Sequence, residues 1–125
     1  MSITLERSDG TDLRVNAWNW GVLHHLVAGA DLFPAEIWEP KRFNGGGTLE
    51  ASQAVALADF LTERVLPRLR EGERIFFDGT VTDVPDDGTF YRDPGDLWRN
   101  YSLHRTVLVD VIEFLRKGVG PVSFY

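Results

Sequence analysis

The apolar residues between positions 50 and 70 place the strongest constraint on the fold of this chain. They recur at steps of three and four residues, which is the period of one face of an α-helix. They are Ala54, Leu57, Ala58, Leu61, Val65 and Leu69. Pro67 lies inside the pattern, where it cannot donate a backbone hydrogen bond and clashes with the carbonyl of Glu63. The sequence therefore predicts a helix over 50–70 with a kink or break near Pro67.

A shorter helix is predicted over "NWGVLHHLVAGA", so that it begins within the stretch "NAWNWGVLHH". Its apolar arc consists of Trp20, Leu23, Leu26, Val27 and Ala30. His24 lies at the edge of this arc, and Trp18 and His25 lie on the opposite side. Asn16 and Asn19 can each cap the first turn by accepting an orphan backbone N–H, so two registers are open.

The last predicted helix covers residues 102 to 117. Its stripe consists of Leu103, Val107, Leu108, Val111, Ile112 and Leu115. Asn100 or Ser102 can serve as its N-cap. The "VSFY" that ends the chain is typical of a short strand.

Residues 3–15 are typical of a β-hairpin. Apolar and polar residues alternate on both sides of Asp9-Gly10, a dipeptide that favours a tight type I′ turn with positive φ at both central residues. Further strands are expected in "RIFFDGTVTDV" and "DDGTFYRD", where Asp78-Gly79 and Asp87-Gly88 compete as turns. We favour a meander that uses both, and a short strand is expected at 48–49.

This mixture of elements predicts an α+β fold. A length of 125 residues is typical of one domain. We expect a single two-layer domain over 1–125, with a mainly antiparallel sheet of four to five strands packed against two to three helices.

Composition excludes several classes of function. The chain has no cysteine, which excludes disulfides, thiolate nucleophiles and thiolate metal sites. Its net charge is −6, and its arginines near position 68 are interleaved with glutamates, which argues against nucleic-acid binding. Its apolar runs are too short to span a bilayer and no signal peptide is evident. We therefore expect a soluble, cytoplasmic protein.

The segment 78–96 is acidic, with six aspartates and one arginine. Such a segment favours a basic protein partner or a cation, although a solvated turn region has the same composition. The spacing does not fit an EF-hand loop, because the third and twelfth positions counted from Asp83 are prolines. An irregular calcium site on Asp83, Asp86 and Asp87 stays open.

Trp38 lies in a proline-bounded loop between Pro34 and Pro40. Two roles are open for its indole: it can pin the loop onto the core, or it can serve as an aromatic anchor for a partner or ligand.

The three histidines are His24, His25 and His104. Adjacent residues on a helix point about 100° apart, so His24 and His25 cannot easily chelate one ion. His104 can approach His24 if the first and last helices pack together. The alternative is that these side chains are satisfied by backbone or water. No serine lies in a nucleophile elbow, and "NGGGT" lacks the lysine of a P-loop.

The order "N-x-W-x-W", "F-N-G-G-G-x-L", "A-V-A-L-A-D-F-L" and "F-L-R-K-G" with a short terminal strand resembles a group of small uncharacterised bacterial proteins. This resemblance spans most of the chain and implies no activity. The chain departs from the group in "DVPDDGTFYRDPGD" and in "GVGPVSFY".

These observations favour a non-catalytic binding protein that needs no cofactor and engages a protein partner. Its candidate contact residues are Trp38, His25, Asp83, Asp86 and Asp87. An immunity-like, toxin-neutralising role fits by analogy alone. The alternative is a small hydrolase or metal-dependent enzyme using His24 and His104 with nearby carboxylates.

Overall fold

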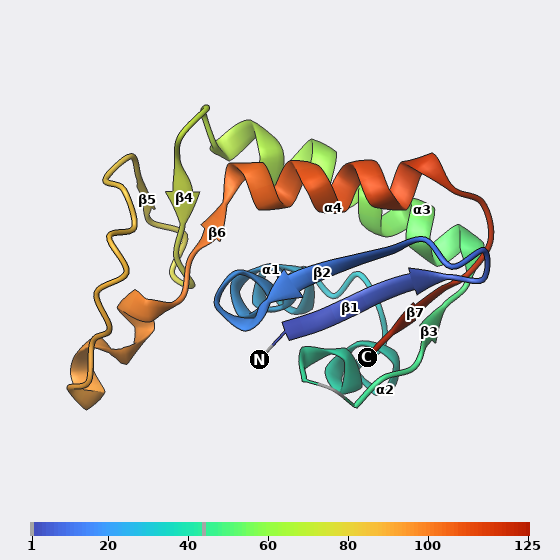
Figure 1. The fold of residues 1–125 in the computed structure, drawn as a ribbon, viewed down its shortest axis with the longest axis horizontal. Coiled ribbons are helices and arrows are strands. Elements are labelled where there is room, and N and C mark those ends of the chain that lie inside the picture. Colours follow the sequence, from blue (N-terminus) through green and yellow to red (C-terminus); the bar gives the residue numbers. More distant parts are fainter. Residues whose placement is uncertain (1, 44) are drawn as a thin grey trace.

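The computed structural model describes residues 2–43 and 45–125, and it confirms the α+β fold (Figure 1). Its larger sheet has four antiparallel strands in the order β2-β1-β7-β3. These strands are β1 (Ser2–Arg7), β2 (Asp12–Asn16), β3 (Thr48–Leu49) and β7 (Val122–Phe124). The strands expected at 48–49 and at the end of the chain are thereby confirmed.

A second antiparallel sheet has three strands in the order β5-β4-β6, so the strands do not form the one sheet expected from the sequence. Its strands are β4 (Arg74–Ile75), β5 (Val81–Thr82) and β6 (Leu103–His104). The helices are α1 (Ala17–Gly29), α2 (Ala35–Trp38), α3 (Ala51–Phe60) and α4 (Arg105–Lys117). Further helical turns are Glu39–Arg42, Leu61–Val65, Leu66–Arg68 and Pro94–Asn100.

The β1–β2 hairpin is confirmed, but its turn is wider than expected. The amide of Gly10 donates to the carbonyl of Arg7 (3.0 Å), and the amide of Arg7 donates to the carbonyl of Thr11 (2.9 Å). Gly10 has a φ of 91°, whereas Asp9 does not have a positive φ. The loop is therefore the three-residue type with a glycine bulge, and not the type I′ turn. Asp9 instead accepts the amide of Thr11 (2.9 Å).

The β4–β5 hairpin repeats this turn around Asp78-Gly79, with the amide of Gly79 donating to Phe76 (3.0 Å). The expected third strand of a meander, "TFYR", is wrong, because β6 occupies the other edge of β4. β6 is held there by the Asn19 side-chain oxygen, which accepts the amide of His104 (2.8 Å). Helix α4 consequently begins at Arg105, without the cap expected from Asn100 or Ser102.

Helix α1 begins in the earlier of the two open registers. Asn16 is its N-cap, and its side-chain oxygen accepts the amide of Asn19 (2.9 Å). Asn19 is freed from capping and is buried between α1 and β6, where it makes the contact to His104. The N-terminus of α1 is therefore fixed to the second sheet.

The helical stretch predicted over 50–70 runs from Ala51 to Arg68, but it is α-helical only to Phe60 and changes type before Pro67. Glu50 and Gln53 form a capping box at its start. After α3 the chain makes one π-helical turn (Leu61–Val65) and then a 3-10 turn (Leu66–Arg68). The missing N–H of Pro67 accounts for the end of regular hydrogen bonding there.

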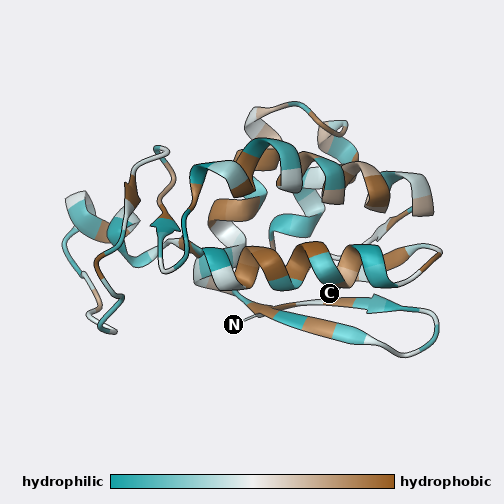
Figure 2. Cartoon of the chain, turned by 90° about the horizontal axis from the view of Figure 1, so that it is seen from above, coloured by the Kyte–Doolittle hydropathy of each residue, from teal (hydrophilic) through white to brown (hydrophobic). Residues whose placement is uncertain are grey.

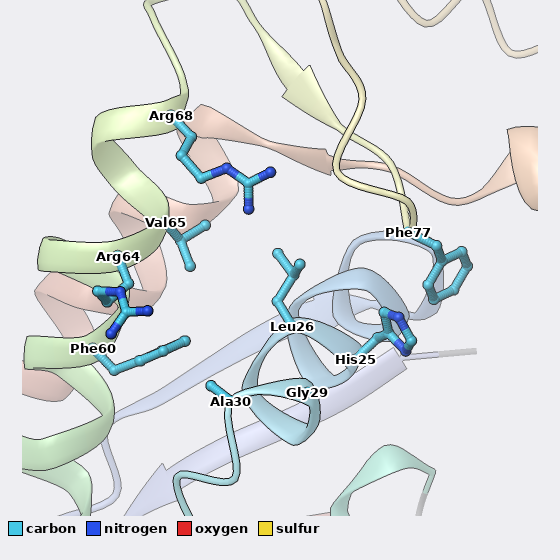
Figure 3. Close-up of a pocket in the computed structure, with 9 residues that line it drawn as sticks. All are labelled: His25, Leu26, Gly29, Ala30, Phe60, Arg64, Val65, Arg68 and Phe77. Carbon is cyan, nitrogen blue, oxygen red and sulfur yellow. The ribbon is translucent and has the colours of Figure 1, made fainter.

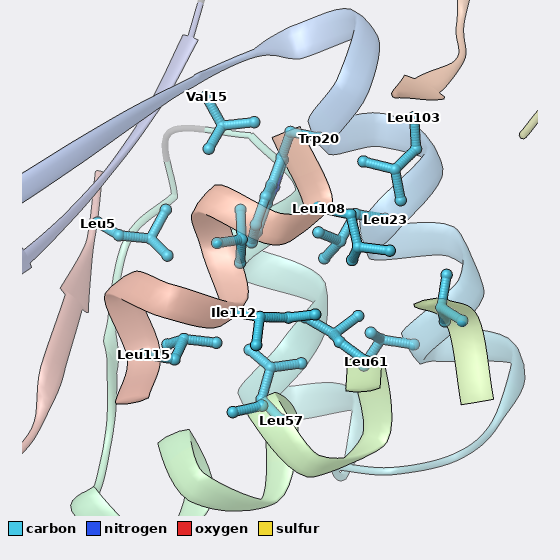
Figure 4. Packing of buried hydrophobic residues seen from close by; sticks show 14 of the residues in the cluster. Leu5, Val15, Trp20, Leu23, Leu57, Leu61, Leu103, Leu108, Ile112 and Leu115 are labelled. Carbon is cyan, nitrogen blue, oxygen red and sulfur yellow. The ribbon is translucent and has the colours of Figure 1, made fainter. Parts of the chain in front are cut away.

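The core lies between the larger sheet and the helices (Figure 4). Its largest fully buried side chains include two tryptophans, Trp20 and Trp38, together with Phe124 of β7. Arg7 of β1 is also buried, and its guanidinium donates to the carbonyls of Leu115 (2.6 Å) and Gly120 (2.9 Å). This arginine satisfies backbone acceptors at and beyond the last turn of α4. Among the described residues, no helix is long and apolar enough to cross a membrane.

Candidate functional site

Residues 83–100, which we call the arm, project to one side of the helices and the larger sheet (Figures 1 and 2). The arm contains no strand and has one helical turn, Pro94–Asn100. Asn100 fastens it internally, since its side-chain amide donates to the carbonyl of Tyr91 (2.8 Å) and its oxygen accepts the amide of Tyr91 (2.7 Å). The guanidinium of Arg99 lies 4.2 Å from the centre of the Tyr91 ring.

A few side chains join the arm to the rest of the chain. Arg74 donates to the carbonyl of Val84 (3.0 Å) and to the hydroxyl of Ser102 (3.1 Å). The rings of Phe76 and Trp98 meet edge to face, with their centroids 5.4 Å apart. The arm is therefore attached by single polar bonds and ring contacts.

Large apolar side chains are exposed along the arm. Phe90 is 54% exposed and Trp98 is 43% exposed, and they are accompanied by Val84 and Leu97. Trp18, on the outer side of α1, is 41% exposed and lies 5.9 Å from the Phe90 ring. Exposed apolar side chains gathered in one region mark sites of interaction more often than scattered ones do.

A cleft next to the arm is lined by Trp18, whose ring contacts Phe90 of the arm. We call it the aromatic cleft, and it has a volume of about 340 Å³. Its lining residues are Ile3, Ala17, Trp18, Gly21, Arg42, Phe43, Phe77 and Tyr101. Arg42 is the charged residue in this lining, and its guanidinium lies 5.2 Å from the centre of the Phe43 ring. At Gly21 a Cβ atom would come within 3.3 Å of the Tyr101 ring. The absence of a side chain at this position therefore lets the ring pack closely against α1.

The aspartates singled out from the sequence are all exposed on the arm. Asp87 accepts the amide of Thr89 (2.9 Å), and the hydrogen bonds from Thr89 lower the pKa of that carboxyl. Asp86 accepts the amide of Gly88 (3.0 Å) and lies 3.7 Å from the imidazole of His104. Asp83 is exposed beside them.

Asp86 and Asp87 line a small hollow of about 60 Å³ together with the guanidinium groups of Arg74 and Arg99. The charge in this hollow is therefore mixed. Within residues 2–43 and 45–125, no group of three or more histidine and acidic side chains is arranged to hold a metal ion.

Trp38 and His24 are buried and bind each other. The Trp38 indole donates to the carbonyl of His24 (3.0 Å), and the His24 Nε2 lies 2.8 Å from the carbonyl oxygen of Trp38. Their rings stack with centroids 4.8 Å apart. Burial lowers the pKa of His24 below its ordinary value. This geometry is what the loop-pinning role predicts for Trp38, which is 2% exposed.

The other two histidines lie apart from this pair. His104 faces Asp86 at the base of the arm. His25 is exposed on the outer side of α1, edge to face with Phe77 at 5.3 Å. His24 and His104 thus have different partners, and this arrangement gives the hydrolase alternative no support.

The residues that sequence reasoning missed are Arg42, Phe43, Phe77 and Tyr101 of the aromatic cleft. Trp18 carried a usable signal, because the helical period places it opposite the apolar arc of α1. The others come from separate segments that meet only in the fold.

Comparison of the chain with protein-family models, with curated proteins and with solved structures finds no match.

Proposed function

We propose that this chain is a non-catalytic binding protein that engages a protein partner through the arm and the aromatic cleft. The partner presents basic side chains to the arm and inserts an apolar side chain into the cleft. The observation that carries this proposal is the concentration of exposed aromatic side chains on a segment that is also acidic.

The side chains of this surface are those that dominate binding energy at protein interfaces. Tryptophan, tyrosine and arginine are enriched among hot-spot residues, which cluster around pockets that exclude water. Trp18, Tyr101 and Arg42 line such a pocket, and Phe90 and Trp98 extend the apolar surface beside it. A partner that covers this region removes these rings from water.

Charge identifies the kind of partner. The arm carries five aspartates and two arginines, a formal net charge of −3. A basic surface is attracted to this segment and its encounter rate is raised, most strongly at low salt. The aspartates therefore contribute chiefly to the rate of association, and the aromatic residues contribute to the lifetime of the complex.

The test starts with capture of proteins from cells of the source organism on the immobilised chain. Each captured protein is identified, purified and measured by calorimetry and surface plasmon resonance. We expect Phe90→Ala to weaken binding of the purified partner by about 2 kcal/mol, which raises the Kd roughly thirtyfold. We expect neutralisation of Asp83, Asp86 and Asp87 to asparagine to slow association about tenfold at low salt.

Val55→Ala and Val119→Ala are the matched controls, because both valines are exposed apolar side chains outside the arm. They should leave the Kd unchanged. The proposal is overturned if no specific partner is captured, or if every purified partner binds the Phe90→Ala protein as tightly as the original chain.

An immunity-like role is one particular form of this proposal. In that case the basic partner is a toxin of the same cytoplasm, and binding must suppress its toxicity. Co-expression of the purified partner's gene with the chain and with its Phe90→Ala variant measures this directly. Equal growth with and without the chain would exclude the role.

A further inference from the structure

A further hollow lies between α1, the π-helical turn and the β4–β5 hairpin, and it shares Phe77 with the aromatic cleft (Figure 3). Its volume is about 320 Å³, within the range of small-molecule sites. Apolar side chains form its walls: Leu26 of α1, Phe60 and Val65 beside or within the π turn, and Phe77 of the hairpin. Arg68, Val65 and Leu26 point into the space between the two helices.

The ionisable side chains that line this hollow are all nitrogen bases. They are Arg64, Arg68 and His25, and no carboxylate lies among the lining residues. This composition is notable because acids outnumber bases in the chain by 19 to 13. A hollow lined by cationic side chains in an acidic protein favours binding of an anion.

These guanidinium groups have hydrogen-bonding capacity to spare. Arg64 makes no hydrogen bond or ion pair within the described part of the chain. Arg68 donates once, from Nη2 to the carbonyl of Gly79 (3.2 Å). Since a guanidinium carries five N–H donors, most of those facing the hollow are free for a ligand.

The backbone that carries these arginines is itself unusual. Arg64 and Val65 belong to the π-helical turn Leu61–Val65, and Phe60 and Arg68 lie on either side of it. Single π turns are rare and occur frequently at functional sites. The turn is thus a second feature of the hollow, independent of its charge.

We infer that this hollow binds a small organic anion that has a carboxylate or phosphate head on an aromatic or aliphatic body. The head lies between Arg64 and Arg68 and accepts their N–H groups. The body packs on Leu26, Phe60 and Val65. This site is separate from the arm and does not depend on a protein partner.

The test uses the isotopically labelled chain and three probes of the same size. Benzoate and phenyl phosphate share an aromatic body and differ in the head, and benzyl alcohol has the body without charge. We expect benzoate or phenyl phosphate to shift the amide signals of residues 25–30, 64–66 and 68 saturably, and to bind at least about tenfold more tightly than benzyl alcohol. The tighter of the two anions identifies the head.

Arg64→Gln is the decisive variant, because this side chain makes no hydrogen bond or ion pair with the described residues and its loss breaks none. It should weaken the preferred anion about tenfold. Arg14→Gln, an exposed arginine on β2, is the matched control and should leave the affinity unchanged. Equal thermal unfolding of the two variants verifies that both are folded.

Three results would overturn the inference: no saturable shift at residues 25–30, 64–66 and 68 with either anion, equal affinity for benzyl alcohol, or unchanged affinity in the Arg64→Gln variant. Because Phe90→Ala leaves this hollow intact, failure here and failure of the partner proposal are separate outcomes.

Discussion

The four tryptophans fall into two regions of the molecule, a buried core and a partly exposed surface. Trp20 and Trp38 are 0% and 2% exposed, and their indole nitrogens donate to the carbonyls of Lys41 (2.7 Å) and His24 (3.0 Å). Trp18 and Trp98, at the arm, are 41% and 43% exposed. The same residue type stabilises the fold in one region and covers a surface in the other.

This difference shows why the arm is not explained by stability alone. Ordering a residue costs about 1–2 kcal/mol of backbone entropy, which burial of apolar surface normally offsets. In the arm, Phe90, Leu97 and Trp98 leave much of their apolar surface in water. An ordered segment with this much uncovered apolar surface gains most when a second molecule covers it.

Replacing one buried and one exposed tryptophan should give the largest difference between the two regions in the free energy of unfolding. Trp38→Ala should lower the free energy of unfolding by about 3–5 kcal/mol, because it leaves a cavity and removes the bond to His24. Trp98→Ala should change it by only about 0.5 kcal/mol, since the side chain is half exposed. Urea denaturation followed by circular dichroism measures both values, and similar losses would abolish the distinction between the regions.

Removal of the internal fastening of the arm should have a smaller, local effect. Asn100→Ala deletes both hydrogen bonds to Tyr91. The free energy of local opening of the arm should therefore fall by about 1–2 kcal/mol, while the free energy of global unfolding changes little. Hydrogen exchange followed by mass spectrometry would show faster exchange in 83–100 and unchanged exchange in α1 and α4. Faster exchange throughout the chain would show that the arm and the core unfold together.

His24 in the core and His104 at the base of the arm allow the two regions to be compared by the pH dependence of stability, where we expect the smallest effect. Burial lowers the pKa of His24 in the folded state below its ordinary value of 6.5, so the unfolded chain binds a proton more readily. Stability from this site is complete above pH 6.5 and falls as the pH drops below it, by at most about 1.4 kcal/mol per pH unit.

Urea denaturation at a series of pH values between 7.5 and about 5 measures this slope, because this range spans the ordinary pKa of His24. We expect His24→Gln to remove the His24 part of the slope. His104→Gln, at the half-exposed histidine beside Asp86, is the control and should keep it. A slope unchanged by His24→Gln would assign the pH dependence to other groups.

Local sequence signals predicted the elements whose contacts are close in the chain. The apolar period located α1, α3 and α4, and Pro67 lies in the 3-10 turn with which the helical stretch ends. Asp9-Gly10 located the first hairpin, although the sequence did not distinguish its bulged turn from a type I′ turn. These features depend on residues within a few positions of one another.

The features that the sequence did not predict depend on distant contacts. β6 has only two residues and exists because Asn19 and Glu73 hold the backbone at His104 and Arg105. The aromatic cleft likewise joins side chains from β1, from α1, from residues 42–43, from the β4–β5 hairpin and from Tyr101, which directly follows the arm. Trp38 could be assigned to the core only when His24 was seen beside it.

The place of β7 in the larger sheet has a consequence for how the chain is made. β1 and β2 leave the ribosome before β7 and can form their hairpin at once, but the second edge of β1 pairs with residues more than a hundred positions later. Until those residues are made, this edge presents unpaired N–H and C=O groups beside the apolar Ile3 and Leu5, a template for association with other nascent chains. Pairing of Phe124 with Leu5 therefore cannot precede synthesis of β7, and a chain stalled before residue 122 is left with an open strand edge that can pair with other chains.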